Sequence, residues 1–299
     1  MPDSSAVIGV GAIGSLLAAS LIEAGQRPLL CVRTAFERLR VTGPNGLRIY
    51  DGFELATSPV SLGPVELVVV ATKCHQTASA ADWLRALVGP DTVVLIVQNG
   101  VEHGRLVAPF VPVGATPVPG IIDVPAQRVR PGEVVAKRTG TLRLPVGPGA
   151  ARAQAGLRPT EILSGVERRA DFDAVMWRKL AVNVISGAIP ALTDRPAGVF
   201  REPAIEALAR AVVKEALQVA EAEGTALPEE TEDEIIAAFL ESDPEALGSM
   251  LQDRRAGRVL ETDARNGAVV RLGRRHGLPT PYNEAVAALA GALNQGVAS

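Results

Sequence analysis

Residues 6–14 read Ala6-Val-Ile-Gly-Val-Gly-Ala-Ile-Gly14, an apolar run that leads into three glycines spaced as G-x-G-x-x-G. The pattern predicts a short strand, a tight turn and the start of a helix, as in dinucleotide-binding folds. Gly9 would allow the turn, Gly11 would let the backbone approach a pyrophosphate, and Gly14 would let the helix lie close to the strand. Three glycines can also form an ordinary turn and helix cap. The strand and helix patterns on either side favour the dinucleotide interpretation.

The residues after this turn complete a βαβ unit and suggest the type of dinucleotide. Backbone N–H groups at the helix start, at Ala12 and Ile13, would face the phosphates. A helix over 15–24 is followed by a buried strand over 28–32. An acidic residue at the end of that strand would bind the ribose 2′-hydroxyl of NAD, but Arg33 stands there and offers a cationic fork for a 2′-phosphate. The sequence therefore favours NADP(H) over NAD(H), with a solvated surface arginine as the alternative.

Polar side chains follow two later apolar strands, at the point where each strand ends. Lys73 and Gln76 come just after the strand expected over 66–71, and Gln98-Asn99-Gly100 follows the strand expected over 92–97. Ligands of doubly wound sheets bind beyond the carboxyl ends of the strands. Each residue alone could be an ordinary loop residue. Together with the glycine turn, Lys73, Gln76 and Asn99 are predicted to surround the cofactor.

Length and composition restrict the class of protein. A chain of 299 residues is long enough for two domains. Its richness in apolar residues and its low aromatic content of 3% suit helices packed on a parallel sheet. A formal net charge of −3 argues against a nucleic-acid partner. No basic-then-apolar leader opens the sequence, and no apolar run reaches the roughly 18 residues of a membrane helix, so the expected location is the cytoplasm without a membrane partner.

Cysteine and histidine usage indicates neither disulfides nor a metal site. Cys31 and Cys74 lie in apolar stretches typical of core residues in a reduced protein. The three histidines, His75, His103 and His276, have no second histidine or cysteine pair at ligand spacing. No metal is therefore expected.

The expected fold class is α/β, with a Rossmann-type doubly wound parallel sheet in residues 1–169 and an all-helical domain for substrate binding and dimerisation in residues 170–299. Residues 147–156 are expected to form surface connections. Later strands are expected at 113–119, 133–138 and 141–146, and residues 47–50 and 53–56 are expected to form a hairpin or an irregular excursion.

The second half is expected to be helical. Helices are predicted over 172–186, 201–223 and 228–241, with a last one after the break at 278–281. Asp243 followed by Pro244 is predicted to cap and open a further helix. Lys179 and Asn183 lie four residues apart and therefore share a face of the first of these helices. On spacing alone that face could equally be a solvated one.

Several segments together resemble one family over nearly the whole chain, from Val7 to about Leu289. Their order and spacing are similar to those of ketopantoate reductases (2-dehydropantoate 2-reductases). The segments are Gly9-x-Gly11-x-x-Gly14, Arg33, Lys73-x-x-Gln76, Gln98-Asn99-Gly100, Trp177-x-Lys179-Leu-x-x-Asn183, Ser249-Met-Leu-Gln-Asp253 and Glu261.

The resemblance implies NADPH-dependent reduction of a 2-keto acid to a 2-hydroxy acid, as in pantothenate biosynthesis, in a cleft between a Rossmann domain and a helical domain. It makes Lys179 the general acid and Glu261 the carboxylate that orients the lysine or a substrate hydroxyl. Asn183 and Ser249 would contact the substrate, and Lys73, Gln76 and Asn99 match residues around the cofactor. An ammonium group suits this chemistry because it neutralises and protonates the developing alkoxide.

Three positions depart from the family pattern. Gly187 stands where the family usually repeats an asparagine one turn beyond Asn183, and Ala197 and Ala246 replace two further pocket asparagines. Each lost hydrogen bond to an ionised substrate group would cost roughly 1.5–3 kcal/mol. The hypothesis that follows is a related reductase whose 2-keto acid is bulkier or more apolar than ketopantoate.

Two other functions remain open from the sequence. One is a related NADP-dependent dehydrogenase of a 3-hydroxy acid or an imine, and the other is a non-catalytic NADP-binding sensor. The presence of both Lys179 and Glu261 argues against the sensor. A homodimer formed through the helical domain is an expectation that rests on the family alone.

Overall fold

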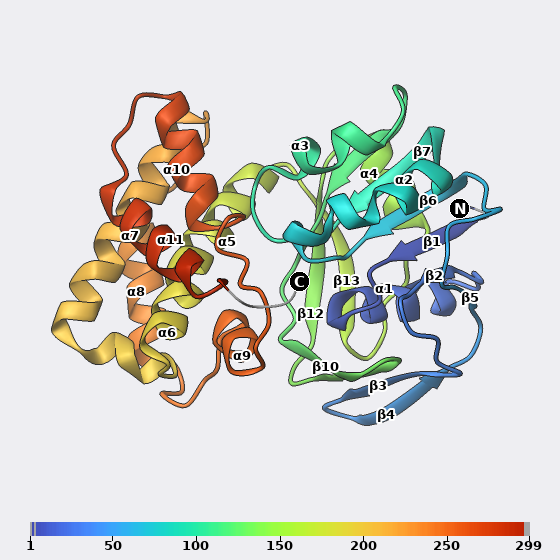
Figure 1. Ribbon diagram of the computed structural model, residues 1–299, viewed down its shortest axis with the longest axis horizontal. Helices are drawn as coiled ribbons and strands as arrows, with labels where there is room; N and C mark the ends of the chain where they lie inside the picture. The colour runs from blue at the N-terminus through green and yellow to red at the C-terminus, as the bar shows by residue number, and fades with distance from the viewer. Residues whose placement is uncertain (1, 3, 296–299) are drawn as a thin grey trace. The chain divides into compact units, whose positions relative to one another are not determined.

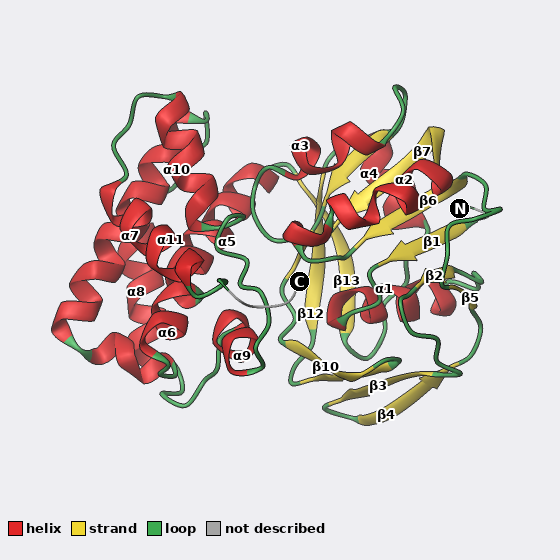
Figure 2. Cartoon of the chain, in the orientation of Figure 1, coloured by secondary structure: helices red, strands yellow, loops and turns green. Residues whose placement is uncertain are grey.

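The computed structural model describes residue 2 and residues 4–295, and within them the chain forms two compact units. The first unit contains residues up to Gln98 and His103–Phe172, and the second contains Asn99–Glu102 and the residues from Asp173 onward. All the strands described lie in the first unit, and the second is built of helices (Figures 1 and 2).

The main sheet of the first unit has six parallel strands in the order β5-β2-β1-β6-β7-β8. A four-stranded sheet has the order β10-β11-β3-β4, and a three-stranded sheet the order β13-β12-β9. The strands are β1 (Ser5–Ile8), β2 (Leu29–Cys31), β3 (Leu39–Gly43), β4 (Gly46–Tyr50), β5 (Glu54–Ala56), β6 (Val65–Val70), β7 (Val88–Ile96), β8 (Thr116–Pro119), β9 (Ile121–Ile122), β10 (Ala126–Arg130), β11 (Glu133–Ala136), β12 (Gly140–Pro145) and β13 (Leu163–Arg169).

The helices of the first unit cover the main sheet and its neighbours, and those of the second unit pack on one another. In the first unit they are α1 (Ala12–Glu23), α2 (Ala81–Leu87), α3 (His103–Val107) and α4 (Pro148–Ala155). In the second unit they are α5 (Phe172–Ser186), α6 (Ala188–Thr193), α7 (Pro203–Ala222), α8 (Thr231–Glu241), α9 (Ser249–Arg255), α10 (Asn266–Arg275) and α11 (Pro281–Ala292). Phe172 itself belongs to the first unit.

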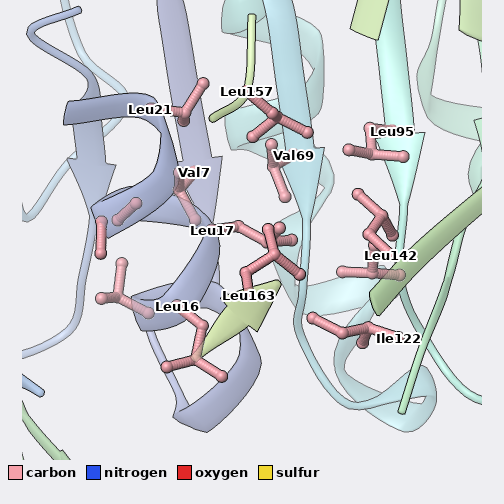
Figure 3. Packing of buried hydrophobic residues seen from close by; sticks show 14 of the residues in the cluster. Val7, Leu16, Leu17, Leu21, Val69, Leu95, Ile122, Leu142, Leu157 and Leu163 are labelled. Carbon is pink, nitrogen blue, oxygen red and sulfur yellow. The ribbon is translucent and has the colours of Figure 1, made fainter. Parts of the chain in front are cut away.

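The central strands are apolar on both faces because both faces are covered. Val7, Val69 and Leu95 point into a core shared with α1, β12 and β13 (Figure 3). Their neighbours along the strands pack on the other side in a second core with Leu84 and Leu87 of α2. Continuous Val, Ile and Leu runs are the pattern expected of a parallel sheet buried in this way. The predicted α/β class with a doubly wound parallel sheet and a helical second half is confirmed.

A buried polar network ties the helices of the second unit together. Asn266 donates to the carbonyl oxygen of Val184 on α5, at 3.0 Å, and to Oδ1 of Asn283 on α11, at 3.0 Å. Asn283 in turn donates to Glu215 of α7, at 2.8 Å. Each of these side chains is buried and cannot bind water, so the hydrogen bonds within the network satisfy its polar atoms instead. The network fixes the start of α10 against α5.

Two predictions of local structure were wrong. The stretch expected as a connection at 147–156 contains α4, which buries Ala150 and Ala153, because a proline in the first turn and a run of alanines suit a short helix. Asp243-Pro244 forms a turn in which the Asp243 carboxylate accepts the N–H of Glu245 at 3.0 Å, and the next helix begins only at Ser249.

The two short segments left as a hairpin or an excursion form neither. Residues 46–50 pair with β3 in the four-stranded sheet, whereas residues 54–56 extend the main sheet beside β2. Further elements were not predicted from the sequence, namely β3, β9, β10 and β13, together with α2, α3 and α6. These elements are short or carry charged residues, so their apolar periodicity is weak.

Candidate active site

The glycine turn lies at the point where the strand order of the main sheet reverses. β1 has β2 on one side and β6 on the other, so the carboxyl ends of β1 and β6 adjoin. Gly9 has a φ of +92°, and a Cβ on it would lie 2.6 Å from the backbone nitrogen of Thr72, just after β6. A Cβ on Gly14 would overlap the carbonyl oxygen of Gly9. Both positions therefore require glycine for the packing of the chain itself.

Gly11 differs from the other two glycines because a Cβ there would meet nothing within 4 Å. Gly11 is the N-cap residue of α1, and as a glycine it has no side chain that could cap the helix. The first turn of α1 contains no acidic residue. The first N–H groups of a helix, here those of Ala12 and Ile13, have no partner within the helix. Open space beside unpartnered N–H groups fits a phosphate. These residues therefore fit a dinucleotide pyrophosphate.

Three of the polar residues predicted around the cofactor, Arg33, Lys73 and Gln76, lie at the carboxyl ends of β2 and β6 in the first unit. Arg33 is exposed, two residues beyond the end of β2. Lys73 precedes the 3₁₀ turn η1 (Cys74–Gln76), and the N–H of Gln76 donates to the carbonyl oxygen of Lys73 at 2.9 Å. Lys73 and Gln76 are both partly buried.

Gln98 has a structural contact that the sequence did not reveal. Its buried amide nitrogen donates to Oγ1 of Thr72 at 3.0 Å and to Oγ1 of Thr77 at 2.8 Å. A ring nitrogen of His103 lies 2.9 Å from the Gln98 carbonyl oxygen. Through these hydrogen bonds, Gln98, just after the end of β7, anchors the loop that contains Lys73.

Asn99 belongs to the helical unit, although it follows a strand of the main sheet. Its Nδ2 donates to Oε2 of Glu261 at 2.9 Å. Three residues later, Glu102 accepts from Arg271 of α10 at 2.6 Å. The structure therefore joins a residue predicted near the cofactor directly to the predicted catalytic carboxylate.

Glu261 is buried, with a residue exposure of 3%, in the segment between α9 and α10. The guanidinium of Arg265 lies beside it, with Nη2 at 3.8 Å from Oε2, and the same Nη2 donates to Oγ of Ser249 at 3.0 Å. Asn99, Glu261, Arg265 and Ser249 thus form one connected group, called here the Glu261 cluster. Arg265 was not predicted from the sequence. The one signal for it was its position four residues after Glu261, a spacing at which two side chains can pair.

Lys179 and Asn183 lie on α5, and both are partly buried. One turn further along the same face is Gly187, whose N–H donates to the Asn183 carbonyl oxygen at 3.2 Å. A Cβ on Gly187 would lie 2.5 Å from Nη1 of Arg265. Gly187, which continues the face of α5 that carries Lys179 and Asn183, therefore lies next to the Glu261 cluster.

The other two departures from the family pattern lie together. The N–H of Ala197 donates to the carbonyl oxygen of Ala246 at 3.0 Å, and the N–H of Gly198 donates to that of Pro244 at 2.8 Å. Ala197 is buried and Ala246 is exposed. The two replaced asparagines therefore belong to one local structure, whereas Gly187 belongs to another.

The remaining reactive groups in the described residues do not form a second centre. Burial raises the pKa of the Cys31 thiol to about 12, so this cysteine is a poor nucleophile. Residues 2 and 4–295 contain no group of three or more His, Cys, Asp or Glu side chains placed to hold a metal ion. In the same residues, no helix combines the length and the apolar character needed to cross a bilayer.

Comparison with known proteins gives the same family over both units. Residues 5–149 match the family model described as "Ketopantoate reductase PanE/ApbA", and residues 171–294 match its C-terminal counterpart. A 2-dehydropantoate 2-reductase of Caulobacter vibrioides is 44% identical over 96% of this chain and 97% of its own length. One from Mycobacterium tuberculosis is 37% identical over 99% of both chains.

Solved structures agree with this fold. The PanE/ApbA family ketopantoate reductase of Ralstonia eutropha JMP134 superposes with a TM-score of 0.85 at 27% identity, over 98% of both chains. A D-mandelate dehydrogenase in a ternary structure with NADH and anilino(oxo)acetate shares the fold, with a TM-score of 0.83 at 24% identity, over 98% of this chain and 99% of that one. The family models and the identity to relatives over nearly the full length agree, and the chain belongs to the ketopantoate reductase family.

Proposed function

We propose that this oxidoreductase uses NADPH to reduce the keto group of 2-dehydropantoate, a 2-keto acid, to the corresponding 2-hydroxy acid. Membership of the family supports this reaction over dehydrogenation of a 3-hydroxy acid or an imine and over a non-catalytic role. The observation that carries the proposal is the Glu261 cluster, in which a buried carboxylate is held by Asn99 and Arg265 beside Ser249. A buried carboxylate held in this way suits a site that must orient a cation and a polar substrate.

The cofactor is a nicotinamide dinucleotide, and its proposed form is NADP(H). The space at Gly11 and the N–H groups at the start of α1 suit the pyrophosphate. Arg33 is exposed just beyond β2, and no acidic residue stands beside it at positions 32–34 to bind a free 2′-hydroxyl. A guanidinium at this place can pair with a 2′-phosphate. We propose that Lys73, Gln76 and Asn99 complete the cofactor site.

The proposed chemistry needs a hydride and a proton. A nicotinamide cofactor, when bound, would supply the hydride for the keto carbon. As the carbon–oxygen double bond opens, negative charge develops on the oxygen, and we assign its neutralisation to the ammonium of Lys179, which donates a proton there. Such general acid catalysis is worth typically about 10²- to 10⁴-fold in rate. We assign to Glu261 the orientation of the lysine or of a substrate hydroxyl, and to Asn183 and Ser249 hydrogen bonds to the substrate.

The departure at Gly187 does not enlarge the site at that point. The missing side chain leaves no open space, because Nη1 of Arg265 and Sδ of Met250 each lie 2.5 Å from the position of a Cβ. The hypothesis of an enlarged, more apolar pocket therefore has no support at Gly187. Ala197 and Ala246 remain the positions where two amides are lost.

A spectrophotometric scan tests the proposal. Purified protein is mixed with NADPH and, in turn, with 2-dehydropantoate and a panel of other 2-keto acids, and kcat/KM is measured from the loss of NADPH absorbance. The highest value is expected for 2-dehydropantoate, with a 2-hydroxy acid as the product in mass spectrometry. A substantially higher value for another keto acid would reassign the substrate, and no oxidation of NADPH with any keto acid would overturn the reaction.

The assembly and the location of the protein stay predictions. We propose a homodimer formed through the helical unit, which size-exclusion chromatography with light scattering would test as a mass twice the 31.2 kDa of the chain. A cytoplasmic location is likewise proposed, and fractionation of cells would test it.

A further inference from the structure

The space that Gly187 leaves is filled by the side chain of a residue far along the sequence. Nη1 of Arg265 and Sδ of Met250 each lie 2.5 Å from where a Cβ on Gly187 would stand. Met250 is fully buried and Arg265 has an exposure of 2%. Any side chain at 187 would therefore displace the guanidinium. Glycine at 187 and arginine at 265 form a matched pair.

The guanidinium of Arg265 has few partners for a buried cation. It donates to Ser249 Oγ at 3.0 Å, while Glu261 Oε2, at 3.8 Å from Nη2, lies beyond hydrogen-bond distance. Its Nε is buried and has no hydrogen-bond partner among the described residues. Buried guanidinium groups usually satisfy most of their five donors. The guanidinium is thus in an ion pair with Glu261 without a direct hydrogen bond to it, and it keeps donor capacity that the helical unit does not use.

The hydrogen bond to Ser249 determines what that hydroxyl can do. A hydroxyl group has one proton to donate and two lone pairs to accept with. Since Arg265 donates to the Ser249 oxygen, the hydroxyl proton must point to another acceptor. Ser249 is an exposed residue that lies over the buried arginine. Its hydroxyl is therefore set as a donor, and the cation behind it strengthens that donation to an anionic acceptor.

We propose that Arg265 is a positioning residue for recognition of the substrate carboxylate. Its guanidinium fills the space beside Gly187, turns the Ser249 hydroxyl toward the substrate, and places a cation behind that hydroxyl, which favours an anionic 2-keto acid over a neutral ketone. This inference rests on the proposed function, because it assigns the carboxylate of the proposed substrate to a place in the same site. It also identifies the residue that compensates for the departure at Gly187.

The first test compares an acid with a neutral substrate of the same shape. Arg265→Met keeps most of the volume and removes the charge and the donors. With 2-dehydropantoate, kcat/KM is expected to fall at least about tenfold, mainly through KM, because the Ser249 hydroxyl loses the cation that directs and strengthens its donation to the ionised carboxylate. With the primary amide of the same keto acid, the fall is expected to stay within about threefold. Equal falls for acid and amide would assign Arg265 a structural role and overturn the inference.

Arg254→Met is the matched control. Arg254, a partly buried residue of α9, donates to the carbonyl oxygens of Ala191 and Leu192 and not to Ser249. Its loss is expected to lower the melting temperature and leave the acid-to-amide ratio of kcat/KM unchanged. A change in that ratio as large as for Arg265→Met would show that any lost guanidinium in this region perturbs recognition, and would contradict the proposal.

A double exchange tests the matched pair directly. Arg265→Ala alone is expected to raise KM for 2-dehydropantoate, and Gly187→Asn alone is expected to do so by displacing the guanidinium. Combining the two places an amide where the guanidinium was, and KM is expected to recover to less than that of either single variant. Additive losses would show that positions 187 and 265 act independently and would overturn the pairing.

Failure of this inference is distinguishable from failure of the proposed function. If the unmodified protein does not reduce 2-keto acids with NADPH, the proposed function falls and this inference falls with it. If the unmodified protein is active and the Arg265 variants treat acid and amide alike, the function stands and the inference alone is overturned.

Discussion

The glycine turn and the Glu261 cluster are built in opposite ways. At the turn, Gly9, Gly11 and Gly14 contribute by having no side chain, so the backbone makes the shape. In the cluster, Glu261 and Arg265 are buried side chains brought together with residues from distant parts of the sequence. A site made by backbone tolerates little change in position, whereas a site made by side chains can be rebuilt from other residues. Packing therefore requires glycine at positions 9 and 14, whereas the space beside Gly187 is filled by the side chains of Arg265 and Met250.

The largest effect is expected on turnover, from a change in the helical unit that leaves the glycine turn untouched. Lys179→Ala should lower kcat at least about a hundredfold, or roughly 2.7 kcal/mol, because the proton donor is lost. NADPH affinity, measured by fluorescence titration, should stay within about threefold if the turn binds the cofactor by itself. Arg178→Ala, which removes a neighbouring exposed ion pair with Glu234, serves as the control with unchanged turnover. A fully active Lys179→Ala variant would remove the lysine from the mechanism.

A single added methyl group in the glycine turn is expected to lower either stability or cofactor affinity, depending on the glycine that receives it. Gly14→Ala would overlap the carbonyl oxygen of Gly9 and is expected to destabilise the protein by about 1–3 kcal/mol, seen as a melting temperature several degrees lower. Gly11→Ala meets nothing in the protein, so it should leave the melting temperature unchanged and weaken NADPH binding alone. Equal losses of stability in the two variants would contradict the distinction between packing and ligand glycines.

Arg33 is the side chain through which the nucleotide region would distinguish its cofactors. Arg33→Asp should shift the ratio of kcat/KM for NADPH over NADH at least about tenfold toward NADH, because a carboxylate repels a 2′-phosphate and accepts from a 2′-hydroxyl. Arg168→Asp makes the same charge change at an exposed residue of β13 and should leave the ratio as it is. An unaltered ratio in Arg33→Asp would show that the 2′-phosphate is recognised by another residue.

The smallest effect is expected at an ion pair outside both regions. Burial pushes the pKa of Glu223 upward, but hydrogen bonds from Arg275 and His276 outweigh it, and the net pKa is lowered. The carboxylate therefore adds stability above its unfolded pKa of about 4.5, and this stability is lost as the pH falls through the lower folded value. Glu223→Gln should cost about 0.2–1 kcal/mol at pH 7. Thermal unfolding should show the difference shrinking below about pH 4; a constant difference would argue against the ion pair.

The sequence predicted what depends on local pattern and missed what depends on distant contacts. Gly9 and Gly14 could be recognised because their spacing reflects steric needs within a few residues. The helices α5 and α7 could be placed because their apolar residues repeat with helical period. Arg265 could not be recognised, because its role depends on contacts with Gly187 and Ser249, which lie 78 and 16 residues away. No local pattern in the sequence indicates contacts over such separations. Gln98 was grouped with the polar residues that follow the strand at 92–97, and its bonds to Thr72 and Thr77 could not be recognised because those residues lie 26 and 21 residues away.

The assignment of residues 99–102 to the helical unit affects how the protein can be recombined. Asn99 holds Glu261, and Glu102 holds Arg271, so these four residues serve the carboxyl-terminal half although they are encoded within the amino-terminal half. A chimaera that joined residues 173–299 to the nucleotide-binding half of another reductase would separate both carboxylate contacts from their partners. Grafting the tetrapeptide together with the carboxyl-terminal half would preserve them.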